Sequence, residues 1–154
     1  MLGNRYESQD CSIARALEIV GERWTLLVVR DALLGVRRFD DFQRSLGVAR
    51  NVLQARLERL VESGILERRV YQERPRRHEY VPTGKGLELW PVIVHLLRWG
   101  DRHLAPDGAP AVFEHRDCGG SVDERLRCDR CGEPLDSGSV RLRRLRSMPA
   151  PAND

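Results

Sequence analysis

Three cysteines and a histidine near the C-terminal end of the sequence have a spacing that suits a metal ion. A histidine and a cysteine are separated by two residues, nine residues follow, and two more cysteines are again separated by two. Zn²⁺ prefers four tetrahedral nitrogen or sulfur ligands, and a tight turn brings both members of such a pair to one side. A glycine after each pair permits the positive φ that the turn needs. The pattern predicts a structural zinc site in a zinc-ribbon-like appendage, with the ligands His115, Cys118, Cys128 and Cys131.

The same residues have a second interpretation. The first pair uses a histidine, and the loop between the pairs is shorter than the roughly fifteen residues usual in such ribbons. A β-hairpin appendage with an empty site, whose cysteines pack as small apolar residues, fits the pattern as well. Both interpretations stay open from the sequence.

The fourth cysteine, Cys11, stands alone just before the first predicted helix. A helix N-terminus can lower a thiol pKa and make it reactive, so Cys11 is a candidate redox sensor, with a buried, unreactive thiol as the alternative. The sequence lacks a Ser-His-Asp order, a glycine-rich phosphate loop and an H-E-x-x-H helix, and its Cys-x-x-Cys does not follow a βαβ pattern. We predict that the chain is not an enzyme.

Arginine is almost the only basic residue in the chain. Of 26 basic residues only Lys85 is a lysine, and the formal net charge is +3. A GC-rich genome favours arginine codons, and selection for a planar fork that binds phosphate and guanine edges would give the same bias. Between Val36 and Glu79 eleven arginines face seven acidic residues, so the local surplus falls in one stretch.

Hydrophobic periodicity predicts four helices in the first half of the chain. Apolar residues recur at three- and four-residue intervals, or cover most of the surface, in each of these segments. The third is ended by a glycine, and the fourth carries a polar strip opposite its apolar face. The predicted helices are Ser12 to Val20, Trp24 to Leu34, Phe39 to Leu46 with both phenylalanines facing inward, and Ala49 to Ser63.

A β-hairpin and a long apolar helix follow. Ile65 to Tyr71 and His78 to Pro82 have strand character and enclose a basic turn. Thr83 can cap a helix from about Gly84 to His103, and a kink is expected at Pro91 inside it. The predicted organisation is a domain over residues 1–104, a Pro/Gly-rich linker over 105–110, the appendage over 111–140, and a basic, then disordered, tail over 141–154.

Two helices joined across a glycine turn and followed by a basic hairpin form the order of a winged helix-turn-helix. The major groove of B-DNA admits one α-helix, and Arg, Asn and Gln match the base edges there. The predicted base-reading residues are therefore Arg50, Asn51 and Gln54, at the start of the second helix. The predicted phosphate and wing contacts are Arg37, Arg38, Arg56, Arg74, Arg76 and Arg77.

The segment Cys11 to Trp99 resembles the HxlR-type branch of the MarR-like bacterial regulators. The resemblance rests on G-E-R-W-T, R-R-F-D-D-F-Q, L-x-x-R-L-x-x-L-x-x-x-G and Y-x-x-T-x-x-G. It implies a cytoplasmic homodimer that binds duplex DNA and regulates nearby genes without enzymatic activity. In some members a cysteine at the position of Cys11, followed by proline, senses electrophiles or oxidants, but Ser12 replaces that proline here.

Dimerisation also follows from the long apolar helix, which exposes more apolar surface than one winged domain could cover. The predicted interface residues are Trp90, Ile93, Leu97 and Trp99, with packing inside their own chain as the alternative. We therefore expect a mainly α fold with a small β-wing, acting as a repressor on a pseudo-palindromic operator. A protein-interaction or thiol-sensing module with weak DNA binding is the alternative. No apolar run is long enough for a membrane span, and no residue identifies a small-molecule effector.

Overall fold

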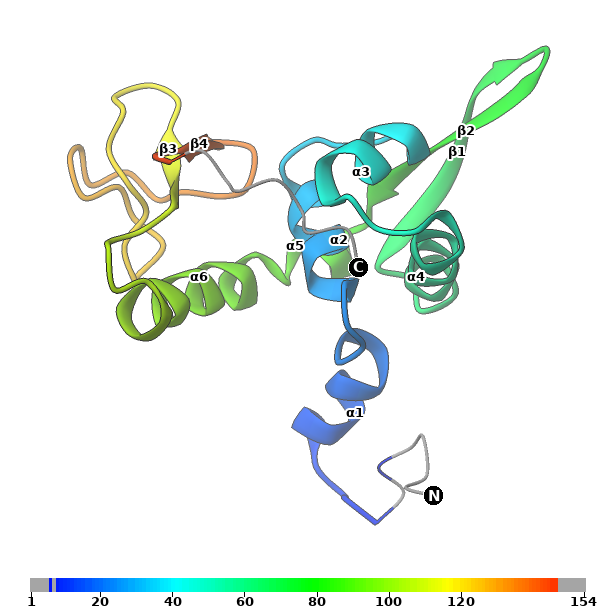
Figure 1. Ribbon diagram of the computed structural model, residues 1–154, viewed down its shortest axis with the longest axis horizontal. Coiled ribbons are helices and arrows are strands. Elements are labelled where there is room, and N and C mark those ends of the chain that lie inside the picture. Colours follow the sequence, from blue (N-terminus) through cyan, green and yellow to red (C-terminus); the bar gives the residue numbers. More distant parts are fainter. Residues whose placement is uncertain (1–5, 7, 147–154) are drawn as a thin grey trace. The chain divides into compact units, whose positions relative to one another are not determined.

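The computed structural model describes residue 6 and residues 8–146, and Figure 1 shows the path of the chain. The chain divides into two compact units. The first holds the described residues up to 32 and residues 36–86, and the second holds residues 33–35 and those from 87 onward. The mainly helical fold with a small antiparallel wing confirms the predicted winged helix-turn-helix. Among the described helices, none is long and apolar enough to cross a membrane.

Four helices build the first unit: α1 (Ser12–Val20), α2 (Thr25–Leu33), α3 (Phe39–Leu46) and α4 (Arg50–Glu62). Each lies within a residue or so of its predicted range. The Sγ of Cys11 accepts a hydrogen bond of 3.3 Å from the N–H of Ala14 and so caps α1. Gly47 ends α3, where its N–H donates to the carbonyl of Gln43.

The core of the first unit comes from the apolar faces of α2, α3 and α4. On α4 the buried leucines recur at intervals of four and three residues, so they share one face and leave the other to polar side chains. The fully buried side chains of these three helices are Thr25, Val28, Val29, Ala32, Phe42, Leu53, Leu57 and Leu60.

The wing is the antiparallel hairpin of β1 (Leu66–Glu73) and β2 (Arg76–Pro82). Leu66 lies opposite Pro82 and Glu73 opposite Arg76, with a register shift between Val70 and Gln72. Both strands run further toward the tip than predicted, because pairing continues through the basic residues. In Figure 1 the hairpin extends away from α3 and α4 as a narrow ribbon.

The predicted long helix is two helices in the structure, α5 (Gly84–Leu87) and α6 (Trp90–Leu104). The predicted kink at Pro91 is therefore wrong: this proline stands in the first turn of α6. Proline is tolerated there because the missing N–H has no intrahelical partner in a first turn. The predicted cap is present, since the hydroxyl of Thr83 accepts from the N–H of Gly86 at 3.2 Å.

The second unit combines α6 with the C-terminal appendage. Strands β3 (Ala111–His115) and β4 (Val140–Arg144) pair antiparallel, and the chain between them forms loops. The indole N–H of Trp90 donates to the carbonyl of Leu135 at 2.9 Å, and the Trp90 ring lies 5.0 Å from that of Phe113.

Two expected boundaries therefore change. Helix α6 groups with the appendage rather than with the wing, and its Trp90 contacts Leu135 and Phe113 of the appendage. Strand β4 also runs past residue 140, where we expected the tail to begin. The expected disordered end, residues 147–154, lies outside the described residues.

Candidate nucleic-acid interface and metal centre

The first turns of α4 present the predicted base-reading side chains to solvent. Arg50, Asn51 and Gln54 are all exposed, whereas Leu53 and Leu57 on the opposite face are fully buried. The side-chain amide of Gln54 donates to the carboxylate of Glu58 at 3.0 Å, which leaves its carbonyl oxygen available. The helix therefore offers hydrogen-bonding groups at the end where a recognition helix meets base edges.

Two exposed arginines, one at the start of α4 and one just before α3, are stacked on aromatic rings. The guanidinium carbon of Arg50 lies 4.5 Å from the centre of the Phe39 ring, and that of Arg38 lies 4.6 Å from the Tyr71 ring. Arg50 is also 3.6 Å from the carboxylate of Asp40. These contacts orient the planar groups before any ligand arrives.

The stacking also corrects the expected position of one phenylalanine. Phe42 is buried as predicted, but Phe39 is only half-buried, because its ring supports Arg50 at the surface. The roles of Phe39 and Tyr71 were missed by sequence reasoning. Their closeness in sequence to basic residues was the available signal, but it does not show which ring meets which arginine.

Two of the predicted phosphate contacts are used inside the fold instead. The guanidinium of Arg37 donates to the carbonyls of Ala32 at 2.5 Å and Val36 at 3.1 Å, and burial lowers its pKa. The guanidinium of Arg56 donates to the carbonyl of Arg23 at 2.9 Å and pairs with Glu22 at 3.1 Å. Both arginines thus hold helix ends and turns together, which corrects their expected role.

The tip of the wing is basic and exposed. Arg74, Arg76 and Arg77 all lie in the exposed segment between residues 73 and 77. Within the described residues none of the three forms an ion pair, so their charges remain available to an anionic partner. The backbone N–H of Tyr80 donates to the carbonyl of Arg37 at 2.8 Å, which ties the wing to the segment before α3.

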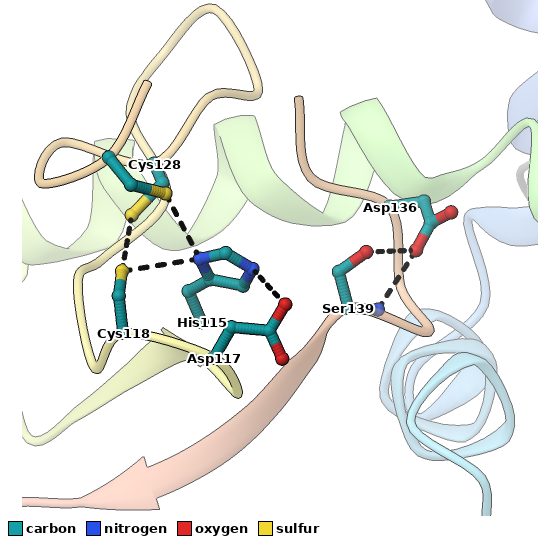
Figure 2. A network of polar contacts seen from close by, with 7 residues as sticks. His115, Asp117, Cys118, Cys128, Asp136 and Ser139 are labelled. Carbon is teal, nitrogen blue, oxygen red and sulfur yellow. Dashed lines mark hydrogen bonds and ion pairs between the residues drawn. The ribbon is translucent and has the colours of Figure 1, made fainter. Parts of the chain in front are cut away.

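The four predicted metal ligands meet in the appendage (Figure 2). The Nδ1 atom of His115 lies 3.3 Å from the sulfur of Cys118 and 3.4 Å from that of Cys131, and the sulfurs of Cys118 and Cys128 are 3.4 Å apart. All four ligand atoms lie within 4.8 Å of one another. Tetrahedral ligands at about 2.3 Å from zinc would be about 3.8 Å apart, so the cluster has dimensions that fit the ion.

The surroundings of the cluster suit thiolates. Burial raises the pKa of Cys128, but the backbone N–H groups of Cys131 and Arg130 and the neighbouring sulfurs outweigh it and lower the pKa to about 6. For Cys118 a backbone hydrogen bond from Gly120 lowers the pKa, but burial and the two neighbouring thiols outweigh it and raise the value. The backbone N–H groups around the cluster therefore stabilise negative charge on its sulfurs. A metal ion would supply the positive charge that keeps all three cysteines deprotonated.

The histidine and the glycines complete the geometry. His115 is buried, and its Nε2 atom lies 3.7 Å from the carboxylate of Asp117, which leaves Nδ1 facing the sulfurs. A carboxylate on the second nitrogen of a ligand histidine is typical of zinc sites. Gly119 and Gly132 have φ of 74° and 77°, as the predicted turns require.

The candidate redox cysteine, Cys11, lies far from this cluster in the sequence and belongs to the first unit. Its side chain is exposed, and its sulfur accepts the N–H of Ala14 at the start of α1. The alternative of a buried thiol is therefore wrong, since the thiol stands at a helix N-terminus in contact with solvent.

The predicted dimer residues divide between two faces of α6. Trp90 and Ile93 are buried inside the second unit, Leu97 is half-buried, and Trp99 is 56% exposed. Trp90 contacts Phe113 and Leu135 of the appendage, and both Trp90 and Ile93 are nearly fully buried, so neither offers a free surface to a second copy. The exposed apolar stripe is instead Val92, Leu96 and Trp99, at successive intervals of four and three residues.

The comparisons with known proteins agree with this architecture. A helix-turn-helix transcriptional regulator of Mycobacterium tuberculosis is 46% identical over 140 residues, which is 90% of this chain and 87% of that protein. The crystal structure of PA1607, described as a candidate transcription factor, has a TM-score of 0.70 and 39% identity, and covers 88% of this chain and 96% of its own. The structure of PA1374 from Pseudomonas aeruginosa has a TM-score of 0.56 and 41% identity, and covers 94% of this chain and 95% of its own.

These three matches cover so much of the chain that they extend beyond the wing and α6 into the appendage. The model of the HxlR-like helix-turn-helix family matches residues 19–108, which include α2 to α6 and the whole wing. The predicted resemblance is confirmed, and the chain belongs to the HxlR-like helix-turn-helix family.

Proposed function

We propose that the protein is a cytoplasmic transcriptional repressor that binds duplex DNA as a homodimer. One observation carries the proposal: Arg50, Asn51 and Gln54 stand exposed on α4, and the arginine-rich wing tip belongs to the same compact unit. The side chains of α4 match base edges in the major groove, and the wing arginines neutralise phosphates beside it. A bound dimer represses by occupying its operator.

The exposed stripe of α6 supports the homodimer. Val92, Leu96 and Trp99 are 42%, 48% and 56% exposed, and burying such a stripe against a second copy removes apolar surface from water. A two-fold axis would place two α4 helices on a pseudo-palindrome whose half-sites lie about one helical turn apart.

The experiment measures binding to a fragment from upstream of the protein's own gene and to an unrelated fragment of equal length, by fluorescence anisotropy. Asn51→Ala is expected to weaken binding to the upstream fragment about 5- to 150-fold per half-site, with a small effect on unrelated DNA, because a bidentate contact to adenine carries about 1–3 kcal/mol. Glu62→Ala, at the far end of the same helix, is the matched control. An intact dimer that binds both fragments equally would contradict the proposal.

The exposed thiol of Cys11 favours a second role as a redox sensor. Hydrogen peroxide would oxidise the Cys11 thiol to a sulfenic acid, with release of water, and the sulfur would lose its capping geometry at the start of α1. DNA binding should then fall after treatment with peroxide in the parent protein and persist in Cys11→Ser. Equal sensitivity of both proteins would remove this role.

We also propose that the cysteine cluster holds one structural Zn²⁺ per chain. Three thiolates and an imidazole select zinc over magnesium or calcium, which prefer oxygen ligands, and four protein ligands leave no position for water. Metal analysis of protein purified without chelators should find one equivalent of zinc. Cys131→Ser should lower this content and Cys11→Ser should not. Much less than one equivalent in the parent protein would contradict the proposal.

A further inference from the structure

Helix α6 is held by three separate pieces of the appendage. On β3, the Phe113 ring packs against Trp90. In the long loop, the carbonyl of Val122 accepts from Arg98 at 3.2 Å, and Glu124 pairs with Arg98 at 3.1 Å. In the last loop, the carbonyl of Leu135 accepts the indole N–H of Trp90.

The four metal ligands lie on these same three pieces. His115 follows Phe113 by two residues on β3, Cys118 and Cys128 stand before and after Val122, and Cys131 precedes Leu135 by four residues. A metal ion in the cluster would therefore cross-link every segment of the appendage that contacts α6.

These segments contain little regular secondary structure, and their remaining support is a small core around Phe113 and Val140 and hydrogen bonds between loops. Within the described residues the appendage has one five-residue strand pair and three isolated bridges, Glu114 with Ser121, Val122 with Cys128, and Arg127 with Pro134. A unit of roughly 40 residues is near the size below which metals, disulfides or partners are usually needed for folding. Binding of a structural metal would then contribute its free energy to the folding of the appendage.

The inner face of α6 depends on this cover. Trp90, Ile93 and Val94 are buried at 4%, 6% and 0% exposure. A helix of 15 residues is marginal in water without packing on its apolar face. Loss of the appendage would remove the contacts of Trp90 with Phe113 and Leu135 and the contacts of Arg98 with Val122 and Glu124, and so weaken the helix that carries Val92, Leu96 and Trp99.

We infer that metal loading of the His115–Cys118–Cys128–Cys131 cluster controls dimerisation, because the metal-bound appendage holds α6 in the form that a second copy recognises. The inference rests on the proposed homodimer and zinc site. The metal acts by folding the cover of the helix and contacts neither the second copy nor DNA. Metal-free protein is monomeric at concentrations where the loaded protein is dimeric.

The first experiment measures the dimer dissociation constant by sedimentation equilibrium, with helix content by circular dichroism, for protein as purified, stripped with a chelator, and reloaded with Zn²⁺ or Mg²⁺. Stripping should raise the constant at least tenfold and lower the helix content. Zn²⁺ should restore both, and Mg²⁺ should not. Cys131→Ser should behave like stripped protein, whereas the matched Cys11→Ser should keep its metal and its dimer.

A second variant tests the coupling without touching a metal ligand. Trp99→Asp places a charge in the outer stripe and should give a monomer with an intact appendage. Because coupling between two binding events is reciprocal, dimerisation must raise zinc affinity. If two bound zinc ions together tighten dimerisation tenfold, dimerisation raises the zinc affinity of each site about threefold. Monomeric Trp99→Asp should therefore lose its zinc to a competing chelator at about threefold lower chelator activity.

The outcomes separate the proposals. A zinc-loaded protein that is monomeric would overturn the homodimer, and protein purified without chelators that holds much less than one equivalent of metal would overturn the zinc site. A zinc-loaded dimer whose dissociation constant is unchanged by stripping would overturn this inference alone. So would equal zinc affinity in the parent protein and in monomeric Trp99→Asp.

Discussion

Replacing both Arg76 and Arg77 by alanine should make DNA binding less sensitive to salt. The two side chains are exposed at the start of β2, and consecutive strand residues project from opposite faces. A wing that lies along one phosphate backbone brings one of them to DNA, and a wing inserted between two backbones brings both. Each phosphate contact contributes about 0.9 to the slope of log affinity against log salt.

The expected change follows from this count. A dimer with one contact per wing loses about 1.8 from the slope, and a dimer with two contacts loses about 3.6. Between 50 and 200 mM salt the affinity of the parent protein should therefore fall more than that of the double variant, by a further factor of about 12 in the first case and about 150 in the second. Titrations by fluorescence anisotropy at four salt concentrations would resolve the two cases.

Arg56→Ala is the control for this measurement. Arg56 is only 22% exposed and is bound to Glu22 and the carbonyl of Arg23, so its removal should lower the midpoint of thermal unfolding and leave the salt slope unchanged. A slope that changes by less than about 1 in the double variant would refute the role of the wing. A slope that drops in Arg56→Ala would refute the assignment of Arg56 to the fold.

Two further predictions concern stability. A Cβ on Gly86 would lie 2.2 Å from the carbonyl oxygen of Ile65, so Gly86→Ala should lower the free energy of unfolding by about 1–3 kcal/mol, whereas Gly84→Ala, where the space is open, should not; chemical denaturation of both variants checks this. The carboxylate of Asp136 accepts from the hydroxyl of Ser139 at 2.7 Å and its N–H at 2.9 Å, and these bonds hold its pKa below the ordinary value (Figure 2). Its stabilising contribution is therefore present at neutral pH and lost as the pH falls through the lowered pKa. Asp136→Asn should melt below the parent protein at pH 7, with the gap closing in acid; a gap that stays constant with pH would contradict this.

The sequence predicts best those features that depend on residues close together in the chain. The leucines of α4 recur with the helical period, and the metal ligands come in pairs that a single turn brings together. For the same reason the wing could be predicted from two short strands and a basic turn. Each of these signals lies within a short stretch of the chain, the longest being the wing from Leu66 to Pro82 and the ligands from His115 to Cys131.

The errors involve partners distant in the sequence. Arg56 looked free on its helix, but its partner Glu22 lies 34 residues earlier. Trp90 was expected to contact a second copy of the chain, but its hydrogen-bond partner Leu135 lies 45 residues later in the same chain. Periodicity shows that a face is apolar or charged, but it does not show what will cover that face. The sequence placed a kink at Pro91, whereas the break lies just before it, between Leu87 and Trp90, because the apolar pattern runs across that point without interruption.

The aromatic supports of Arg50 and Arg38 set a rule for redesigning operator preference. Exchanging only the exposed residues of α4 with those of a relative would move Arg50 without the ring of Phe39, and the transplanted guanidinium would then have to be ordered at the moment of binding. Two residues must therefore be exchanged together: positions 39 and 50 across the helix-turn-helix, and likewise position 38 with position 71, which lies near the tip of the wing. Reprogrammed proteins built by single-helix swaps should bind weakly to every sequence, and restoring the ring should recover their affinity.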